Sequence, residues 1–154
     1  MSVLTQGAQE GFTDQVIIKY NDLTETVSGT AETVSCFTIP KDCIIESVAY
    51  SLAEEFSGGS ISSLNIIIGD DDNADGFIEA NSVLTGATPI SSAVNSGAYY
   101  NDLTTANTVN GKVYDNTATK IVSIVFTPAS DALTALTAGK LIIKATIIDL
   151  STEI

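Results

Sequence analysis

Short runs in which apolar and polar residues alternate dominate the chain, and they predict β-strands rather than helices. The clearest run covers residues 44–53. Its apolar face, interrupted at Glu46, is predicted to contain Ile44, Val48, Tyr50 and Leu52. The segments expected to form strands are residues 16–20, 33–39, 44–53, 64–68, 77–84, 112–114, 121–127 and 140–150.

Turn signals separate these strands about every ten residues, a spacing typical of antiparallel β-sandwiches and barrels. One strand is expected to stop before Pro128, and a short helical turn capped by Ser130 or Asp131 is expected to follow it. The predicted fold class is therefore all-β, with a single-domain antiparallel β-sandwich over residues 15–154. Residues 1–14 are polar and show no clear period, which indicates an extended N-terminal arm.

The length of 154 residues suits one domain with a single core, and 44% hydrophobic residues are enough to build it. No apolar run approaches the length of a membrane span. The first residues, MSVLTQGAQEG, contain neither the basic residues nor the apolar stretch of a secretory signal. We therefore expect a protein that stays in the cytosol, or one whose leader is missing from the sequence.

Charge narrows the range of functions. The net charge is −13, all six basic residues are lysines, and the chain has neither arginine nor histidine. Such a surface repels phosphates, so no nucleic-acid partner is expected. A histidine base and histidine-ligated zinc are excluded, tryptophan is absent, and no G-x-S-x-G turn occurs. We expect no enzymatic activity and no membrane partner. A carboxylate-rich surface instead suits solubility, hard cations or basic protein partners.

Cys36 and Cys43 are the only cysteines. A turn at Pro40 and Lys41 is expected to place them on one sheet face, diagonally offset, near or beyond the reach of a disulfide. We favour two small buried thiols in a reducing compartment over a disulfide.

Residues 64–81, LNIIIGDDDNADGFIEAN, join an aliphatic strand to the most acidic run in the chain. Alternate oxygen-bearing residues in a tight turn can point at one cation, as in calcium loops. By this spacing the candidate calcium ligands are Asp71, Asn73, Asp75 and Glu79. Gly76 is expected to allow the bend, and the Phe77 carbonyl is a further candidate ligand. However, Ser82 stands where the final glutamate belongs, so we favour a solvated or interface loop over a calcium site. No other cofactor is expected.

The region from Thr85 to Asn110 is rich in small polar residues and is expected to be functional surface or irregular strands. Within it, Tyr99-Tyr100-Asn101-Asp102 has two interpretations. It can form an aromatic and polar patch for carbohydrate or protein recognition. The favoured interpretation is that the tyrosines close one end of the sandwich core.

The order of these features resembles the small virion proteins of tailed bacteriophages. The closest group is the capsid decoration, or cement, proteins of cyanophages and other aquatic phages. The resemblance covers roughly residues 33–150. It depends on the G-D-x-D-x-x-D-G-F turn at residues 69–77, and on the L-T-A-G-K sequence at residues 136–140 before an aliphatic strand ending in Asp149-Leu150.

This resemblance implies a jelly-roll-like β-sandwich, often a homotrimer, assembled in the host cytoplasm and located on the outer surface of the virion capsid. Its partner there is the major capsid protein, whose neighbouring subunits it ties together. The family has no catalytic residues, and it acts by mass action, since a protein that binds only the assembled shell stabilises that shell. An alternative is a receptor- or glycan-binding module, such as a head fibre or tail component, that uses Tyr99, Tyr100 and the calcium-like turn. A neck or tail component is a third interpretation, which the sequence does not separate from the first.

Overall fold

The computed structural model describes residues 2–4, 13–84, 97, 99, 112–114 and 119–150. In this part of the chain nearly all regular structure is β-strand, and two short 3₁₀ turns accompany the strands. The strands are β1 (Ser2–Leu4), β2 (Asp14–Lys19), β3 (Glu32–Ile39), β4 (Cys43–Ser57), β5 (Ser63–Asp70), β6 (Ile78–Ser82), β7 (Lys112–Tyr114), β8 (Lys120–Ala129) and β9 (Ala138–Asp149). The turns are η1 (Tyr20–Asp22) and η2 (Leu133–Ala135).

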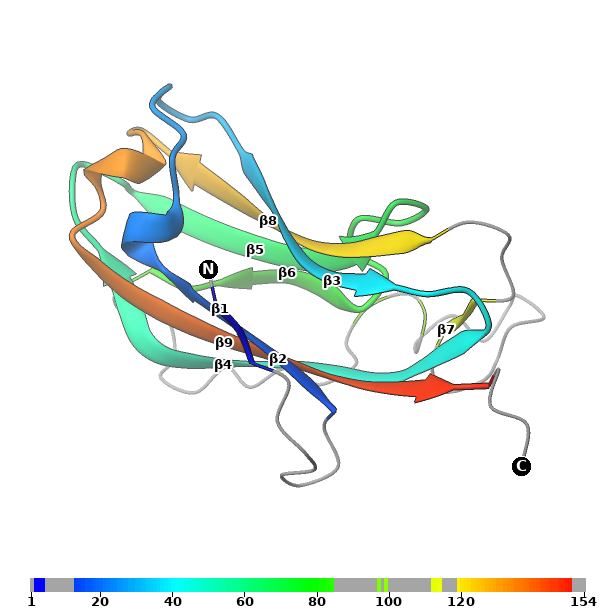
Figure 1. The fold of residues 1–154 in the computed structure, drawn as a ribbon. Coiled ribbons are helices and arrows are strands. Elements are labelled where there is room, and N and C mark those ends of the chain that lie inside the picture. The colour runs from blue at the N-terminus through cyan, green and yellow to red at the C-terminus, as the bar shows by residue number, and fades with distance from the viewer. Residues whose placement is uncertain are drawn as a thin grey trace.

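The strands form two antiparallel sheets, which confirms the predicted β-sandwich. One sheet has the order β1-β2-β9-β4-β7 and the other has the order β3-β8-β5-β6. Figure 1 shows the sheets as two layers, with the four-stranded sheet above the five-stranded one. Except for the β5–β6 hairpin, each connection from β2 onward crosses to the opposite sheet. Eight strands in the orders β2-β9-β4-β7 and β3-β8-β5-β6 form a jelly roll, so the expected jelly-roll-like topology is also present.

Part of the predicted N-terminal arm is a strand. Ser2–Leu4 pairs antiparallel with β2, with Ser2 opposite Ile17, and forms one edge of the five-stranded sheet. Residues 1 and 5–12 of the predicted arm lie outside the described residues, and β2 begins at Asp14.

The inward face of β4 differs from the prediction because the strand contains a β-bulge. The register of β4 against β9 shifts between Ile45 and Ser47, and Glu46 is an extra, exposed residue. Ile45 and Val48 are both fully buried, whereas Ile44 is only half-buried. The prediction that Ile44 shares the inward face of Val48 is therefore wrong, and the interruption at Glu46 marks the bulge.

The two cysteines are free and buried, as predicted, but they do not share a sheet face. Cys36 belongs to β3 and Cys43 to β4, and these strands lie in opposite sheets. The expected hairpin between them is therefore wrong. Asp42 adopts a left-handed conformation (φ 58°) in the connection that carries the chain across. Burial raises the pKa of the Cys36 thiol to about 12, so this thiol remains protonated and unreactive at neutral pH.

The core lies between the two sheets, and a close glycine contact helps to join them. Phe56 from β4 and Phe126 from β8 are both fully buried, and their ring centroids lie 5.7 Å apart. Gly139, at the start of β9, has φ 138°. A Cβ atom at this position would overlap the ring of Phe56. The glycine in the L-T-A-G-K sequence is therefore required by both backbone conformation and packing.

Two predictions near the end of β8 are corrected. β8 continues through Pro128 to Ala129 and does not stop before the proline. Proline has no N–H to donate, and it is tolerated here because the pairing of β8 with β3 already ends at Phe126. The predicted helical turn is present as η2, but its N-cap is Ala132 and not Ser130 or Asp131. The Asp131 carboxylate instead accepts hydrogen bonds from the backbone N–H groups of Ala132 and Ser60, each 2.8 Å long. Neither turn, nor any other described segment, is a helix with the length and hydropathy needed to cross a membrane.

Candidate functional site

The acidic run forms a compact turn between β5 and β6. The backbone N–H of Asp70 donates to the carbonyl of Asn73 at 2.9 Å, and the N–H of Gly76 donates to the same carbonyl at 3.1 Å. The N–H of Phe77 then donates to the carbonyl of Ile68 at 3.0 Å and returns the chain to the sheet. The turn is therefore held by its own backbone hydrogen bonds, and we call residues 70–77 the acidic turn.

Asp70 is the buried centre of the acidic turn, with 7% of its surface exposed. Its Oδ1 atom accepts hydrogen bonds from the backbone N–H groups of Asp72 and Asn73, at 3.0 and 2.9 Å. The same atom accepts a 2.6 Å hydrogen bond from the hydroxyl of Tyr99. An aspartate that accepts from backbone groups two and three residues further on is a common turn-stabilising arrangement. Asp70 therefore holds the turn together, a role that the spacing of the candidate calcium ligands did not indicate.

The predicted calcium ligands do not all converge. The Oδ2 atom of Asp71 accepts a 3.2 Å hydrogen bond from the backbone N–H of Ile121 in β8. The side-chain carbonyl of Asn73 accepts a 3.4 Å bond from the N–H of Asp75, which is itself exposed. Glu79 lies exposed on β6. Within the described part of the chain, no three His, Cys, Asp or Glu side chains are grouped as a metal site. The calcium site stays a prediction.

An ion pair also ties the acidic turn to β8. The Nζ atom of Lys120 lies 2.8 Å from Oδ1 of Asp72, and neither side chain is buried. Hydrogen bonding to Asp72 is the main cause of the raised pKa of Lys120. An exposed pair of this kind contributes little to stability. Lys120 is paired directly with Asp72 and also attracts Asp71 and Asp70 over a longer range.

Tyr99 closes this end of the core, which confirms the favoured interpretation for this residue. Its ring packs edge-on against Phe77, with centroids 5.0 Å apart and an interplanar angle of 67°. Its backbone N–H donates to the carbonyl of Gly76 at 2.8 Å, and the backbone N–H of Gly97 donates to the carbonyl of Phe77 at 2.9 Å. The rest of the predicted aromatic and polar patch, residues 100–102, lies outside the described residues.

Gly76 has a different role from the one predicted. It is not among the described glycines with positive φ, so its backbone does not need a left-handed bend. A Cβ atom at Gly76 would instead overlap the ring of Tyr99. Similarly, a Cβ atom at Gly69 would overlap the backbone of Asn73 and Ala74. Both glycines allow close packing, which lets the acidic turn fold back over β5 and receive Tyr99.

The hydroxyl of Tyr99 gives the acidic turn a dependence on alkaline pH. Burial raises the pKa of Tyr99 above its usual value of 10.0, and the hydrogen bond to Asp70 and the nearby carboxylates raise it further. The folded protein therefore holds this proton at a pH where the unfolded chain has released it. The resulting stabilisation is fully present below about pH 10 and is lost as the pH rises above it.

We expect the free energy of unfolding of the wild-type protein to fall more steeply above pH 10 than that of Tyr99→Phe. The substituted ring keeps the packing against Phe77 but has no proton to lose. Urea unfolding at a series of pH values measures the two slopes. Equal slopes for the two proteins would show that Tyr99 does not titrate in this way.

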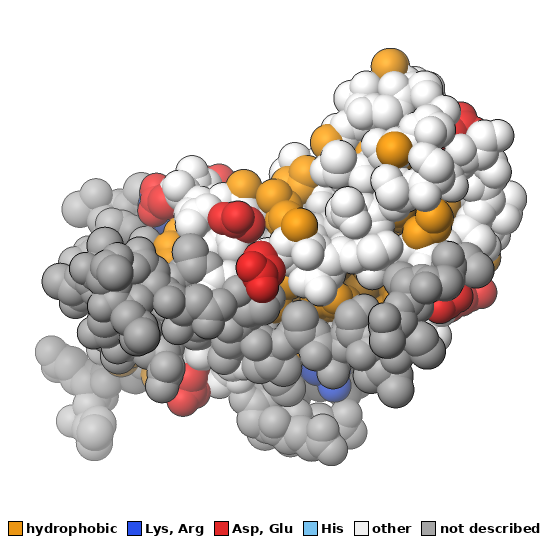
Figure 2. Space-filling view, turned by 180° about the vertical axis from the view of Figure 1, so that it is seen from behind, with side chains coloured by type: hydrophobic (Ala, Val, Ile, Leu, Met, Phe, Trp, Pro, Cys, Tyr) orange, Lys and Arg blue, Asp and Glu red, His pale blue; other side chains and the backbone are white. Residues whose placement is uncertain are grey.

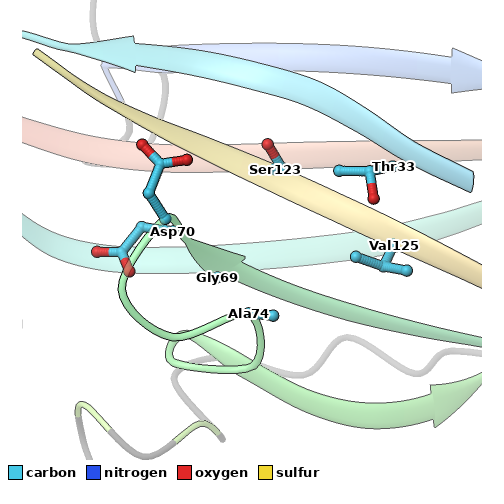
Figure 3. A pocket seen from close by; sticks show the side chains of 7 residues that line it. Thr33, Gly69, Asp70, Ala74, Ser123 and Val125 are labelled. Atoms are coloured by element: carbon cyan, nitrogen blue, oxygen red, sulfur yellow. The ribbon is translucent and has the colours of Figure 1, made fainter.

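A cavity of about 150 Å³ lies beside the acidic turn, on the outer face of the four-stranded sheet. Figure 3 shows side chains from β3, β5, β8 and the turn around it. The residues that line it are Thr33, Gly69, Asp70, Asp71, Ala74, Ser123 and Val125. The Asp70 carboxylate accepts hydrogen bonds from within the turn, and Oδ2 of Asp71 accepts one from Ile121 of β8. Both groups keep their negative charge, so the cavity offers shape and negative charge to a binding partner.

Comparisons with known proteins inform the fold. The sequence matches no protein-family model and no curated protein. Among solved structures, the chain is similar to a chain in the structure described as the cyanophage Pam1 capsid asymmetric unit, with a TM-score of 0.55. The two sequences are 12% identical, and the match covers 95% of this chain and 91% of that chain. At this identity the similarity establishes a shared fold, over nearly the full length of both chains.

Proposed function

We propose that this chain is a structural protein of a phage virion, and more specifically a capsid decoration or cement protein. In this role it binds the outer surface of the assembled head and bridges neighbouring major capsid subunits. The observation that carries the proposal is the match to a chain of a cyanophage capsid, which spans almost the whole of both chains. Jelly rolls occur in many viral capsid domains, but also in lectins and cupins, so the topology supports the role without determining it.

The chemistry of the chain suits a part that is present in many copies. Its net charge of −13 limits self-aggregation at high concentration. The buried, unreactive thiol of Cys36 suits assembly in the host cytoplasm. The role requires no catalytic residue and no cofactor. The proposed partners are the major capsid protein and two further copies of this chain in a trimer, and no nucleic acid or membrane.

The alternative role, receptor or glycan binding, has less support from the geometry. That role would use Tyr99 as an aromatic platform. The ring of Tyr99 is instead packed against Phe77, and its hydroxyl donates to Asp70. A tyrosine that is held in this way supports the acidic turn and offers little surface to a sugar.

The test is the stability of expanded shells with and without the purified chain. We expect saturable binding and a rise in the melting temperature of the shell that grows with the concentration of the free chain. Binding at 100 times the dissociation constant stabilises each site by about 2.7 kcal/mol. Unexpanded shells serve as the control, since they should bind weakly. A shell whose melting temperature does not change, or that binds no chain, would rule out the decoration role.

A further inference from the structure

On the outer face of the four-stranded sheet, two adjacent rows of residues from β3, β8 and β5 contain no charged side chain. The register places Thr33, Val125 and Ile67 side by side in one row. The next row contains Ser35, Ser123 and Gly69. Their neighbours along β5 and β8, such as Ile68 and Ile124, are fully buried, so these two rows face outward. The chain has nineteen acidic residues, yet none of them lies in these two rows. Charged side chains are usually depleted at the centre of protein interfaces, so this part of the surface is a candidate interface.

The cavity gives this face a depression that can receive a side chain. The side chains of Thr33 and Val125 line it from the sheet, and Ala74 lines it from the acidic turn that curls over Gly69 (Figure 3). The cavity is open to solvent and has both apolar and polar lining residues, and its volume is about 150 Å³, close to that of a cavity that holds benzene. One aliphatic or aromatic side chain of a partner is therefore the right size to fill it. Figure 2 shows the molecule from behind, with the two sheets seen from the side, and on this side too exposed hydrophobic side chains lie beside acidic ones.

The rim of the cavity selects the charge of the partner. Asp71 lines the cavity, and the 3.2 Å hydrogen bond from the N–H of Ile121 leaves its negative charge in place. Asp72, by contrast, is paired with Lys120. A lysine or arginine placed next to the filled cavity would complement Asp71. A second copy of this chain is a poor source of that basic side chain, since the chain has no arginine and a net charge of −13.

We propose that this face, from β3 to the acidic turn, docks a segment of the shell protein that presents an apolar side chain next to a lysine or arginine. The inference rests on the proposed decoration role and adds which surface makes the contact. The apolar side chain fills the cavity between Val125 and Ala74, and the basic group meets Asp71. The uncharged rows around the cavity form the surrounding, water-excluding contact.

The experiment compares two substitutions that each add one negative charge to an exposed strand position. Thr33→Glu places the charge at the cavity. Ser51→Glu places it on the outer face of the other sheet, where Ser51 lies opposite Ile142. Binding of each variant to expanded shells of the phage's own major capsid protein is measured, and thermal unfolding of the free variants verifies that both are folded. We expect Thr33→Glu to weaken binding at least about tenfold, because the longer side chain occupies the cavity and brings a charge against the apolar side chain that must enter it. We expect Ser51→Glu to bind like the wild type.

A third variant, Asp71→Asn, tests the choice of partner. We expect it to weaken binding at low salt, with a smaller difference from the wild type as salt rises, because an exposed charge contact is screened. Equal binding of Asp71→Asn and the wild type at low salt would show that no basic group of the partner meets Asp71. If the wild type binds shells and Thr33→Glu binds equally well, the docking surface lies elsewhere while the decoration role stands. If the wild type does not bind shells at all, the proposed function itself fails.

Discussion

Replacing Gly139 by alanine is expected to lower the free energy of unfolding by about 3–5 kcal/mol. The backbone at this position has φ 138°, which residues with a side chain rarely adopt. The added Cβ would also overlap the ring of Phe56, which is fully buried and contacts Phe126 of the opposite sheet. Natural domains are stable by only about 5–15 kcal/mol, so the loss is a large part of the total. Urea unfolding followed by far-ultraviolet circular dichroism measures it.

Gly29→Ala is the matched control for this prediction. Gly29 also has a positive φ, 72°, but an added Cβ would have no atom within 4 Å. We therefore expect Gly29→Ala to cost only about 1 kcal/mol, from backbone strain alone. A second test uses the double variant. In a protein that already carries Phe56→Ala, there is room for the new methyl group, so adding Gly139→Ala should cost less stability than it does in the wild type. Equal costs for Gly139→Ala and Gly29→Ala would show that the contact with Phe56 is not what excludes a side chain.

Replacing Asp70 by alanine is expected to destabilise the protein by about 2–4 kcal/mol, which corresponds to roughly 5–15 °C in melting temperature. The substitution removes the acceptor of three hydrogen bonds, from the N–H groups of Asp72 and Asn73 and from the hydroxyl of Tyr99. These donors lie in a partly buried place and lose a charged partner. Differential scanning calorimetry gives the change in melting temperature.

Asp75→Ala is the control, because Asp75 belongs to the same turn but is exposed. It should change stability by no more than about 0.5 kcal/mol. Similar losses for Asp70→Ala and Asp75→Ala would contradict the central role assigned to Asp70. Measuring both variants in calcium and in EDTA also tests the predicted calcium site, since only a bound ion would make Asp75→Ala costly in calcium alone.

The pattern of apolar residues was sufficient to predict the strands and the sandwich, since alternation depends only on which residues face the core. It was insufficient where one strand contains an extra residue. In β4 the bulge at Glu46 shifts the inward face by one position, so Ile45 replaces Ile44 in the core. Likewise, the separation of Cys36 and Cys43 into opposite sheets depends on a three-residue connection, residues 40–42, that reads equally well as a hairpin turn. Both errors come from the path of the backbone.

The acidic turn shows the same limit at the candidate site. Spacing along the sequence treats the carboxylates as equivalent groups that can face one cation. In the fold, Asp70 is turned inward because β5 continues to it and Tyr99 reaches it from 29 residues away. Neighbouring carboxylates are directed to β8 by contacts with Ile121 and Lys120, about 50 residues further along the chain. These long-range contacts are absent from any local pattern, although the favoured interpretation, a solvated or interface loop, agrees with the docking surface proposed here.

The measurement that tests the account most directly is an electron cryomicroscopy reconstruction of the intact phage head that carries this chain. We predict jelly-roll density of this chain on the outer surface, between major capsid subunits. The outer face of its four-stranded sheet should be turned towards the shell, with a basic residue of the shell protein near Asp71. A reconstruction in which the outer surface of the head lacks this chain, or in which the chain occurs only in the neck, tail or fibres, would contradict the proposed function.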